Sequence, residues 1–239
     1  MSNSKDFFHF KKFYVRHQNA SMKVGTDAVL LGSWASLTHA PQSILDIGTG
    51  CGLIALMLAQ RFPKTPITGI DIHEPSIEEA QYNAQNFPLE NNLTFIHQEY
   101  LSYQPEKLFE LIVSNPPFFT NDLQSPIAKR NGARHQIHLT FEQLLKKSSS
   151  ILSPNGALCL ISPVEQMNHF IQLAPNEGFS PVRICRIYSY EQEEPVRILG
   201  EFKKETSQAP IIEKLVIYHR DRTYTESYKR LTKDFYLKF

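Results

Sequence analysis

The stretch "SILDIGTGCGLIALMLA", residues 43–59, joins a short apolar run to a glycine-rich turn and then to a helical pattern. Residues 43–48 are typical of a buried strand, and the alanine and leucine residues after the turn favour a helix. Gly48, Gly50 and Gly52 occupy the turn, where the absence of a Cβ lets backbone approach a ligand closely. The unit predicts an α/β protein with a ligand at this turn.

The spacing of the glycines argues against a dinucleotide-binding oxidoreductase. That fingerprint requires a third glycine at position 53, where this chain has Leu53. The pattern here begins instead with Asp46 and continues as D-x-G-x-G-x-G.

Further strand-like runs alternate with helical patterns along the chain, which favours a parallel sheet. Helices are expected over 25–37, after capping boxes formed by Ser76 with Glu79 and by Thr140 with Gln143, and over the tail 224–239. The later strands can pair antiparallel and close the sheet edge. The expected strands are 43–48, 66–72, 92–98, 108–114, 156–162, 181–190, 195–204 and 213–219.

Composition sets broad limits on function. The 239 residues are 41% hydrophobic and 21% charged, and the net charge of +1 is lower than a duplex-DNA coating protein usually carries. No apolar stretch reaches bilayer length and no signal-peptide core is present, so we expect a soluble, cytoplasmic protein. Cys51, Cys159 and Cys185 form no CxxC pair, which indicates neither a disulfide scaffold nor a zinc site.

The strand at 108–114 runs into Asn115-Pro116-Pro117-Phe118. Two prolines fix φ twice and remove two backbone donors, so this turn offers carbonyl groups without partners inside the segment. The end of a parallel strand is also where α/β sheets bind their ligands. A proline-terminated core strand is the alternative reading, and we prefer it only for Phe119.

The D-x-G-x-G-x-G turn resembles the cofactor loop of class I S-adenosylmethionine-dependent methyltransferases. The resemblance implies a Rossmann-like α/β fold, a seven-stranded sheet with helices on both faces. It also implies that Asp71 accepts hydrogen bonds from ribose hydroxyls, that Glu99 meets the adenine amine, and that Ile72 lies beside them. Read singly, Asp46 could be a turn acceptor, Asp71 a cap and Glu99 a solvated loop charge. The implied cofactor-binding residues are Asp46, Gly48, Gly50, Gly52, Asp71, Ile72, Glu99 and Asn115.

Asn-Pro-Pro-Phe resembles the motif of methyltransferases that act on the amino group of adenine or glutamine. The resemblance implies that the Asn115 side-chain oxygen and the Pro116 carbonyl accept the two N–H groups of that amine. The lone pair of the amine nitrogen then points at the cofactor methyl. Positioning and electrostatic stabilisation promote the methyl transfer, so no strong base is needed to deprotonate the amine first. Pro117 keeps the turn rigid and Phe118 stacks on the flat substrate. The family often has tyrosine where this chain has Phe118 and aspartate where it has Glu99.

Residues 10–35, 132–145 and 224–239 are similar to the bacterial tRNA(Val) adenine-37 N6-methyltransferase family. The similarity implies N6-methylation of adenosine 37 in the anticodon loop of a valine tRNA. It also implies a segment 1–40 with a lid helix, ahead of a methyltransferase domain over 41–239. Lys23 or Thr26 is expected to meet the cofactor carboxylate, although Thr26 could simply cap a helix.

Basic residues gather near the predicted active site and could hold anticodon-stem phosphates, although such clusters are usually just solvated. Arg134 and His135 are equally compatible with a phosphate or base contact and with a solvated loop. His135 and His138 lack a carboxylate companion, so no metal is expected. The candidate RNA contacts are Lys11, Lys12, Arg16, Lys129, Arg130, Arg134 and His135, and a further basic group lies at Lys229, Arg230 and Lys233.

Three other functions remain open. A release-factor glutamine methyltransferase shares the NPP(Y/F) motif but usually carries a helical N-terminal domain, for which about 40 residues are too few. A DNA adenine methyltransferase would carry a target-recognition insertion, and none is obvious. A non-catalytic cofactor-binding or RNA-binding module would not need an intact Asn115-Pro116-Pro117.

Overall fold

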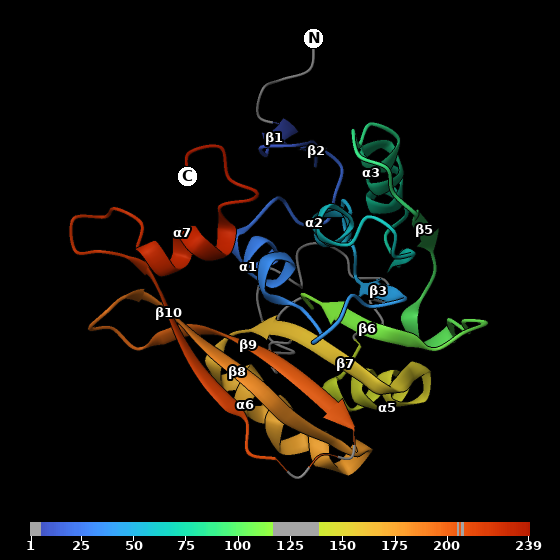
Figure 1. The fold of residues 1–239 in the computed structure, drawn as a ribbon. Helices are drawn as coiled ribbons and strands as arrows, with labels where there is room; N and C mark the ends of the chain where they lie inside the picture. Colours follow the sequence, from blue (N-terminus) through green and yellow to red (C-terminus); the bar gives the residue numbers. More distant parts are fainter. Residues whose placement is uncertain (1–5, 117–138, 205, 207) are drawn as a thin grey trace, which may run out of the picture.

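The computed structural model describes residues 6–116, 139–204, 206 and 208–239, and its centre is one twisted sheet (Figure 1). The strands lie in the order β10-β8-β9-β7-β6-β3-β4-β5. Their bounds are β3 Ile44–Ile47, β4 Ile67–Asp71, β5 Leu93–His97, β6 Phe109–Ser114, β7 Leu152–Ser162, β8 Phe179–Tyr190, β9 Pro195–Lys204 and β10 Ile211–Tyr218.

All eight expected strands are present, and five of them, β3 to β7, form a parallel set. β9 lies antiparallel between β7 and β8, so the later strands do include antiparallel pairs, but the edge strand β10 pairs parallel with β8. Within the described residues the sheet has eight strands, one more than the seven that the class I resemblance implies, and the additional strand is β10, which pairs parallel with β8. Leu215 and Ile217 of β10 are buried in the main core, so this strand removes apolar surface from water.

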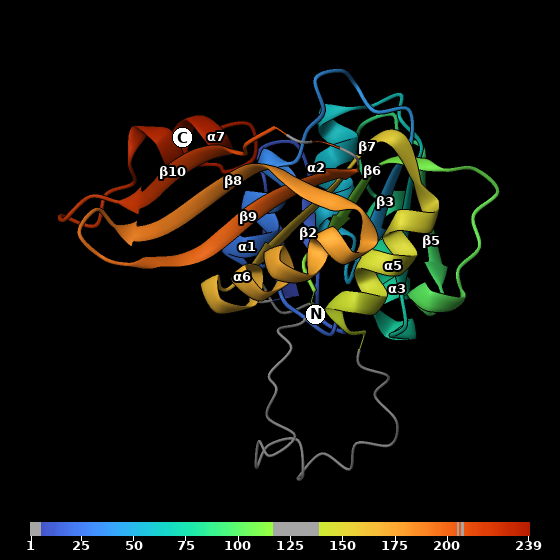
Figure 2. The same ribbon diagram turned by 90° about the horizontal axis from the view of Figure 1, so that it is seen from below.

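Helices cover both faces of the sheet (Figures 1 and 2). One face carries α1 (Thr26–Trp34), α2 (Leu53–Arg61), α3 (Glu74–Gln85) and α7 (Glu226–Thr232), and the other carries α5 (Phe141–Ile151) and α6 (Val164–Leu173). Short 3-10 turns lie at Tyr100–Ser102 and Ala174–Glu177. β1 (Phe7–His9) pairs with β2 (Tyr14–Arg16) outside the main sheet. None of the described helices is long and apolar enough to cross a bilayer.

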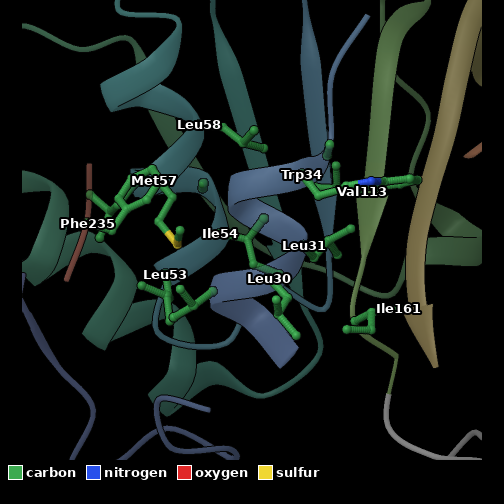
Figure 3. Close-up of a cluster of buried hydrophobic side chains, with 14 of the residues drawn as sticks. Leu30, Leu31, Trp34, Leu53, Ile54, Met57, Leu58, Val113, Ile161 and Phe235 are labelled. Atoms are coloured by element: carbon green, nitrogen blue, oxygen red, sulfur yellow. The ribbon is translucent and has the colours of Figure 1, made fainter. Parts of the chain in front are cut away.

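The main core lies between α1, α2 and the sheet, and Figure 3 shows α1 inserting Leu30 and Leu31 toward Val113 and Ile161. α1 is buried on almost every side, which explains why its sequence is apolar without a polar stripe. A Cβ at Gly32 would stand 2.8 Å from Met57 Sδ, so glycine permits this close helix contact. This close packing of α1 on α2 holds the first residues of α1 beside the glycine turn.

The two predicted capping boxes have different outcomes. Thr140 Oγ1 accepts from Gln143 N at 3.2 Å and Gln143 Oε1 accepts from Thr140 N at 3.0 Å, which confirms the box that begins α5. The box at Ser76 and Glu79 is wrong, because α3 begins at Glu74 and both side chains are fully buried against the N-terminal segment. The tail helix is also shorter than expected.

Candidate cofactor and substrate site

The glycine turn between β3 and α2 has the backbone that its sequence requires. Gly48, Gly50 and Gly52 have φ values of 68°, 56° and 81°, a left-handed region that favours glycine. A Cβ at Gly52 would approach Phe95 Cζ to 2.9 Å, whereas a Cβ at Gly48 or Gly50 would meet nothing within 4 Å. The first two glycines therefore face open space and the third permits close packing under the turn.

This open space is a pocket of about 300 Å³. One wall is the glycine turn and the first residues of α2, and the opposite wall is the segment that leads into α1. Asn115 lies at its rim from the end of β6. The lining residues are Ser21, Met22, Lys23, Val24, Gly25, Thr26, Asp27, Ala28, Gly48, Thr49, Gly50, Cys51, Leu53, Ile54 and Asn115.

Asp46 lies completely buried below the turn and does not line the pocket. Its Oδ2 accepts a hydrogen bond from Thr49 Oγ1 at 2.7 Å, while its Oδ1 has no partner among the described residues. Burial raises the pKa of Asp46 to about 7, although the Thr49 hydroxyl and a backbone bond oppose the shift. Asp46 thus supports the turn from beneath.

Asp71 stands at the end of β4, where both of its carboxylate oxygens accept backbone bonds. Oδ2 accepts from Gly50 N at 2.9 Å and Oδ1 accepts from His73 N at 2.9 Å. A carboxylate has about four lone-pair sites, so two remain for ribose hydroxyls. Ile72, next to it, is 56% exposed, an unusual position for an isoleucine, and Glu99 is half-buried beyond β5. These three lie outside the pocket lining, so their cofactor contacts stay predictions.

Asn115 and Pro116 follow β6 directly. Pro116 is buried, and Asn115 Oδ1 is buried without a partner among the described residues. A buried acceptor without a partner is rare because it costs desolvation energy, so this oxygen is available to accept a hydrogen bond. Pro117, Phe118 and Phe119 lie outside the described residues.

Lys23 and Thr26 both line the pocket and are exposed. Thr26 is not the cap of α1, because Gly25 occupies that position and Thr26 is the first helical residue. The neighbouring Asp27 binds Arg197 of β9 at 2.9 Å, which ties the start of α1 to the sheet.

The candidate RNA-binding residues differ in whether their charged groups already have partners within the chain. Lys11 Nζ donates to the Lys233 carbonyl at 2.6 Å and to the Phe239 carbonyl, and Arg16 Nε donates to Glu79 Oε2 at 2.5 Å. Lys12 is exposed. Lys129, Arg130, Arg134, His135 and His138 lie outside the described residues.

Sequence reasoning missed most of the pocket wall formed by 21–28 and the buried polar side chains of α3. Ser76 bonds to Ser21 in that wall, and Glu79 and Asn83 bond to Asn19 and Arg16 in the segment that leads into it, all far away in sequence. The only available signal was the presence of polar residues at helical spacing. The part of the chain that the structure describes contains no cluster of metal-binding side chains, and its three cysteines are buried and free.

S-adenosylmethionine fits the residues that are present. The glycine turn leaves room for a close approach, Asp71 keeps free lone pairs, and the pocket has a cationic side chain, Lys23, for a carboxylate. Its size also suits part of such a ligand.

Comparisons with known proteins agree with this geometry. Residues 23–182 match the family model described as the methyltransferase small domain. A protein of Parabacteroides distasonis, 41% identical over 97% of this chain and 98% of its own length, is named tRNA1(Val) (adenine(37)-N6)-methyltransferase. A protein of Flavobacterium johnsoniae with the same name is 40% identical over 97% of this chain and 99% of its own.

Solved structures show the same fold at low sequence identity. A predicted O-methyltransferase from Agrobacterium tumefaciens has a TM-score of 0.70 at 21% identity, covering 87% of this chain and 96% of its own. An N-methyltransferase from Bradyrhizobium japonicum, solved with S-adenosyl-L-homocysteine, has a TM-score of 0.52 at 17% identity, covering 74% of this chain and 84% of its own.

Proposed function

The chain belongs to the methyltransferase small domain family and, within it, to the tRNA1(Val) (adenine(37)-N6)-methyltransferases, and we propose that it methylates N6 of adenosine 37 in the anticodon loop of a valine tRNA. The cofactor is S-adenosylmethionine, which supplies an electrophilic methyl group on a sulfonium sulfur. A tRNA substrate also implies a cytoplasmic site of action.

The observation that carries the proposal is the buried Oδ1 of Asn115, which lines the cofactor pocket and has no partner among the described residues. This acceptor is available to a hydrogen-bond donor of a ligand, and an exocyclic amine supplies one. The Pro116 carbonyl, held by the rigid proline pair, is the second acceptor in the proposal. Two fixed acceptors orient both N–H bonds of the amine.

Orientation is the main task of the protein in this reaction. The amine of adenine is a poor nucleophile, because its lone pair is delocalised into the ring. Acceptors out of the base plane favour a pyramidal nitrogen whose lone pair points into the pocket. No strong general base is required, since the product proton leaves after methyl transfer. Phe118, through stacking, holds the base.

Adenosine 37 lies in a loop, so turning it outward costs less than extruding a base from a duplex. Lys12, Lys129, Arg130, Arg134 and His135 are the proposed RNA contacts that remain, while the charged groups of Lys11 and Arg16 already have partners within the chain.

The test is incubation with methyl-labelled cofactor and total tRNA, followed by mapping of the modified nucleotide. The expected product is N6-methyladenosine at position 37 of a valine tRNA. A transcript with guanosine at position 37 is the matched negative control. Release factor and duplex DNA are supplied in parallel reactions, and label on either of them in place of tRNA would overturn the proposal.

A further inference from the structure

The segment between β2 and α1, residues 17–25, contains neither helix nor strand, yet it supplies most of one wall of the cofactor pocket. Its backbone groups need hydrogen-bond partners wherever they are buried. Three side chains on one face of α3 supply them. The wall that faces the glycine turn therefore depends on a helix that does not line the pocket.

The hydrogen bonds form an ordered series. Asn83 Oδ1 accepts from Arg16 N at 2.8 Å, and its Nδ2 donates to Arg16 O at 2.8 Å. Glu79 Oε1 accepts from Asn19 N at 3.0 Å, and Ser76 Oγ accepts from Ser21 N at 3.1 Å. As the segment advances from 16 to 21, its partners run backwards along α3 from 83 to 76. The helix face thus replaces the neighbouring strand that this segment lacks.

Asn83 also reaches the opposite wall. The same Nδ2 that holds Arg16 donates to the carbonyl of Cys51, inside the glycine turn, at 2.8 Å. One amide therefore connects the glycine turn with Arg16, the residue at which the segment leading into the opposite wall begins. Asn83 is 1% exposed, so loss of its side chain would leave these backbone groups buried without partners.

Glu79 is fully buried, and a buried carboxylate is costly unless it is paired. Arg16 Nε pairs with it at 2.5 Å, and the Arg16 guanidinium lies 3.6 Å from the ring centre of Tyr82. A buried ion pair of this kind contributes little net stability compared with apolar packing but requires one arrangement of its partners. This favours a role in placing the segment rather than in general stability.

We propose that Asn83 and Glu79 are positioning residues, which hold segment 16–25 against the glycine turn and so build the cofactor pocket. The inference rests on the proposed function only in naming the ligand. The Ser76–Glu79 spacing, which resembles a capping box, serves this anchor instead.

The test compares Asn83→Ala and the isosteric Glu79→Gln with control variants at exposed positions of the same helix, Gln85→Ala and Glu78→Gln. Two quantities are measured in full-length protein: hydrogen exchange of amides 16–21 without cofactor, and the Kd of S-adenosylmethionine by calorimetry. We expect exchange at least roughly tenfold faster and a Kd at least roughly tenfold higher for the α3 variants, and no change for the controls.

Arg16→Met and the double variant Arg16→Met/Glu79→Gln complete a double-mutant cycle. If Arg16 and Glu79 act as one unit, the double variant has the same Kd for S-adenosylmethionine as the single variant that binds it less tightly. Unchanged exchange and Kd in both Asn83→Ala and Glu79→Gln would overturn the inference. A higher Kd accompanied by equally faster exchange throughout α3 and the sheet would also overturn it, because that would indicate a general loosening of the fold. Wild-type protein without cofactor affinity would contradict the proposed function instead.

Discussion

At the scale of single residues, Asn115 is the position where the chemistry depends on one atom. Its Oδ1 has no partner among the described residues, so an alanine there removes an acceptor without breaking a known internal bond. We expect Asn115→Ala to lower kcat by roughly 10²–10³, as for loss of one transition-state hydrogen bond, with the Kd of S-adenosylmethionine close to wild type. Single-turnover kinetics and calorimetry measure the two. Retained turnover would remove Asn115 from the mechanism.

Asp71 is expected to act on binding rather than on turnover. Asp71→Ala removes the proposed ribose acceptor and also the bond to Gly50 N. Calorimetry should show S-adenosylmethionine binding weakened by about 1.5–3 kcal/mol, the range for a hydrogen bond to a charged group. Asp221→Ala is the matched control, because Asp221 similarly accepts from the backbone of Thr223 but in a different, exposed turn. Binding that does not change would place the ribose contact elsewhere.

Asp46 gives the folded protein a specific pH dependence. Burial raises the pKa of Asp46 in the folded protein from 3.8 to about 7. The folded state therefore binds the proton more tightly than the unfolded state. The contribution of this proton to the free energy of unfolding is complete below pH 3.8 and is lost as the pH rises to about 7. Asp46→Asn removes the titration. Relative to this variant, the unfolding free energy of cofactor-free wild type should fall between pH 5 and pH 7 by up to about 1.4 kcal/mol per pH unit. Urea titrations at several pH values measure it, and parallel profiles would mean that Asp46 titrates normally.

At the scale of elements, the start of α5 shows how a local signal translates into stability. Thr140 and Gln143 satisfy each other's backbone N–H groups. Thr140→Ala should lower the free energy of unfolding by about 0.5–2 kcal/mol. Chemical denaturation checks this, with Ser150→Ala as the control, because Ser150 is exposed and bonds only back to its own helix at Lys147. Equal effects of the two variants would argue against the cap.

Elements defined by neighbouring residues could be predicted from the sequence. Apolar runs placed every strand of the central sheet, and the Thr140–Gln143 spacing placed the start of α5. β7 begins earlier than expected, at Leu152, because pairing with Phe109 extends it beyond its apolar run. Its polar first residues gave no signal of that pairing.

Elements decided by distant residues could not be predicted. Ser76 and Glu79 have the spacing of a capping box, and only the arrival of segment 16–21 decides that they bond to it. The glycine turn was identifiable, because its positive φ values favour glycine. Asn115 was singled out by the Asn-Pro-Pro-Phe motif after β6, and its role stays a prediction. The wall formed by 21–28 has no periodic pattern and depends on its tertiary partners.

At the scale of the whole molecule, the described N-terminal segment that begins at residue 6 packs against the C-terminal tail, on the face of the sheet that carries α1 and α2. Phe235 is buried in the same core as Phe10 and α1, and Lys11 donates to tail carbonyls. Figure 1 shows α7 and the tail beside α1 on this face. α1 in turn packs on α2, directly after the glycine turn. Tail, N-terminal segment and cofactor pocket are therefore one packed unit.

This packing gives two neighbouring lysines different expected roles: Lys11 holds the tail, and Lys12 is available to contact RNA. Binding of tRNA should weaken steeply with salt, because phosphate contacts release counterions. Lys12 is exposed, so Lys12→Ala should reduce the slope of log K against log salt by about 0.7–0.9. Lys11→Ala is the matched control, because its amine is already bonded to the Lys233 carbonyl, and it should lower stability while leaving the slope unchanged. Filter binding at several salt concentrations measures the slopes. Affinity that stays flat between low and moderate salt would contradict phosphate recognition altogether, and equal slope changes in both variants would contradict the separation of their roles.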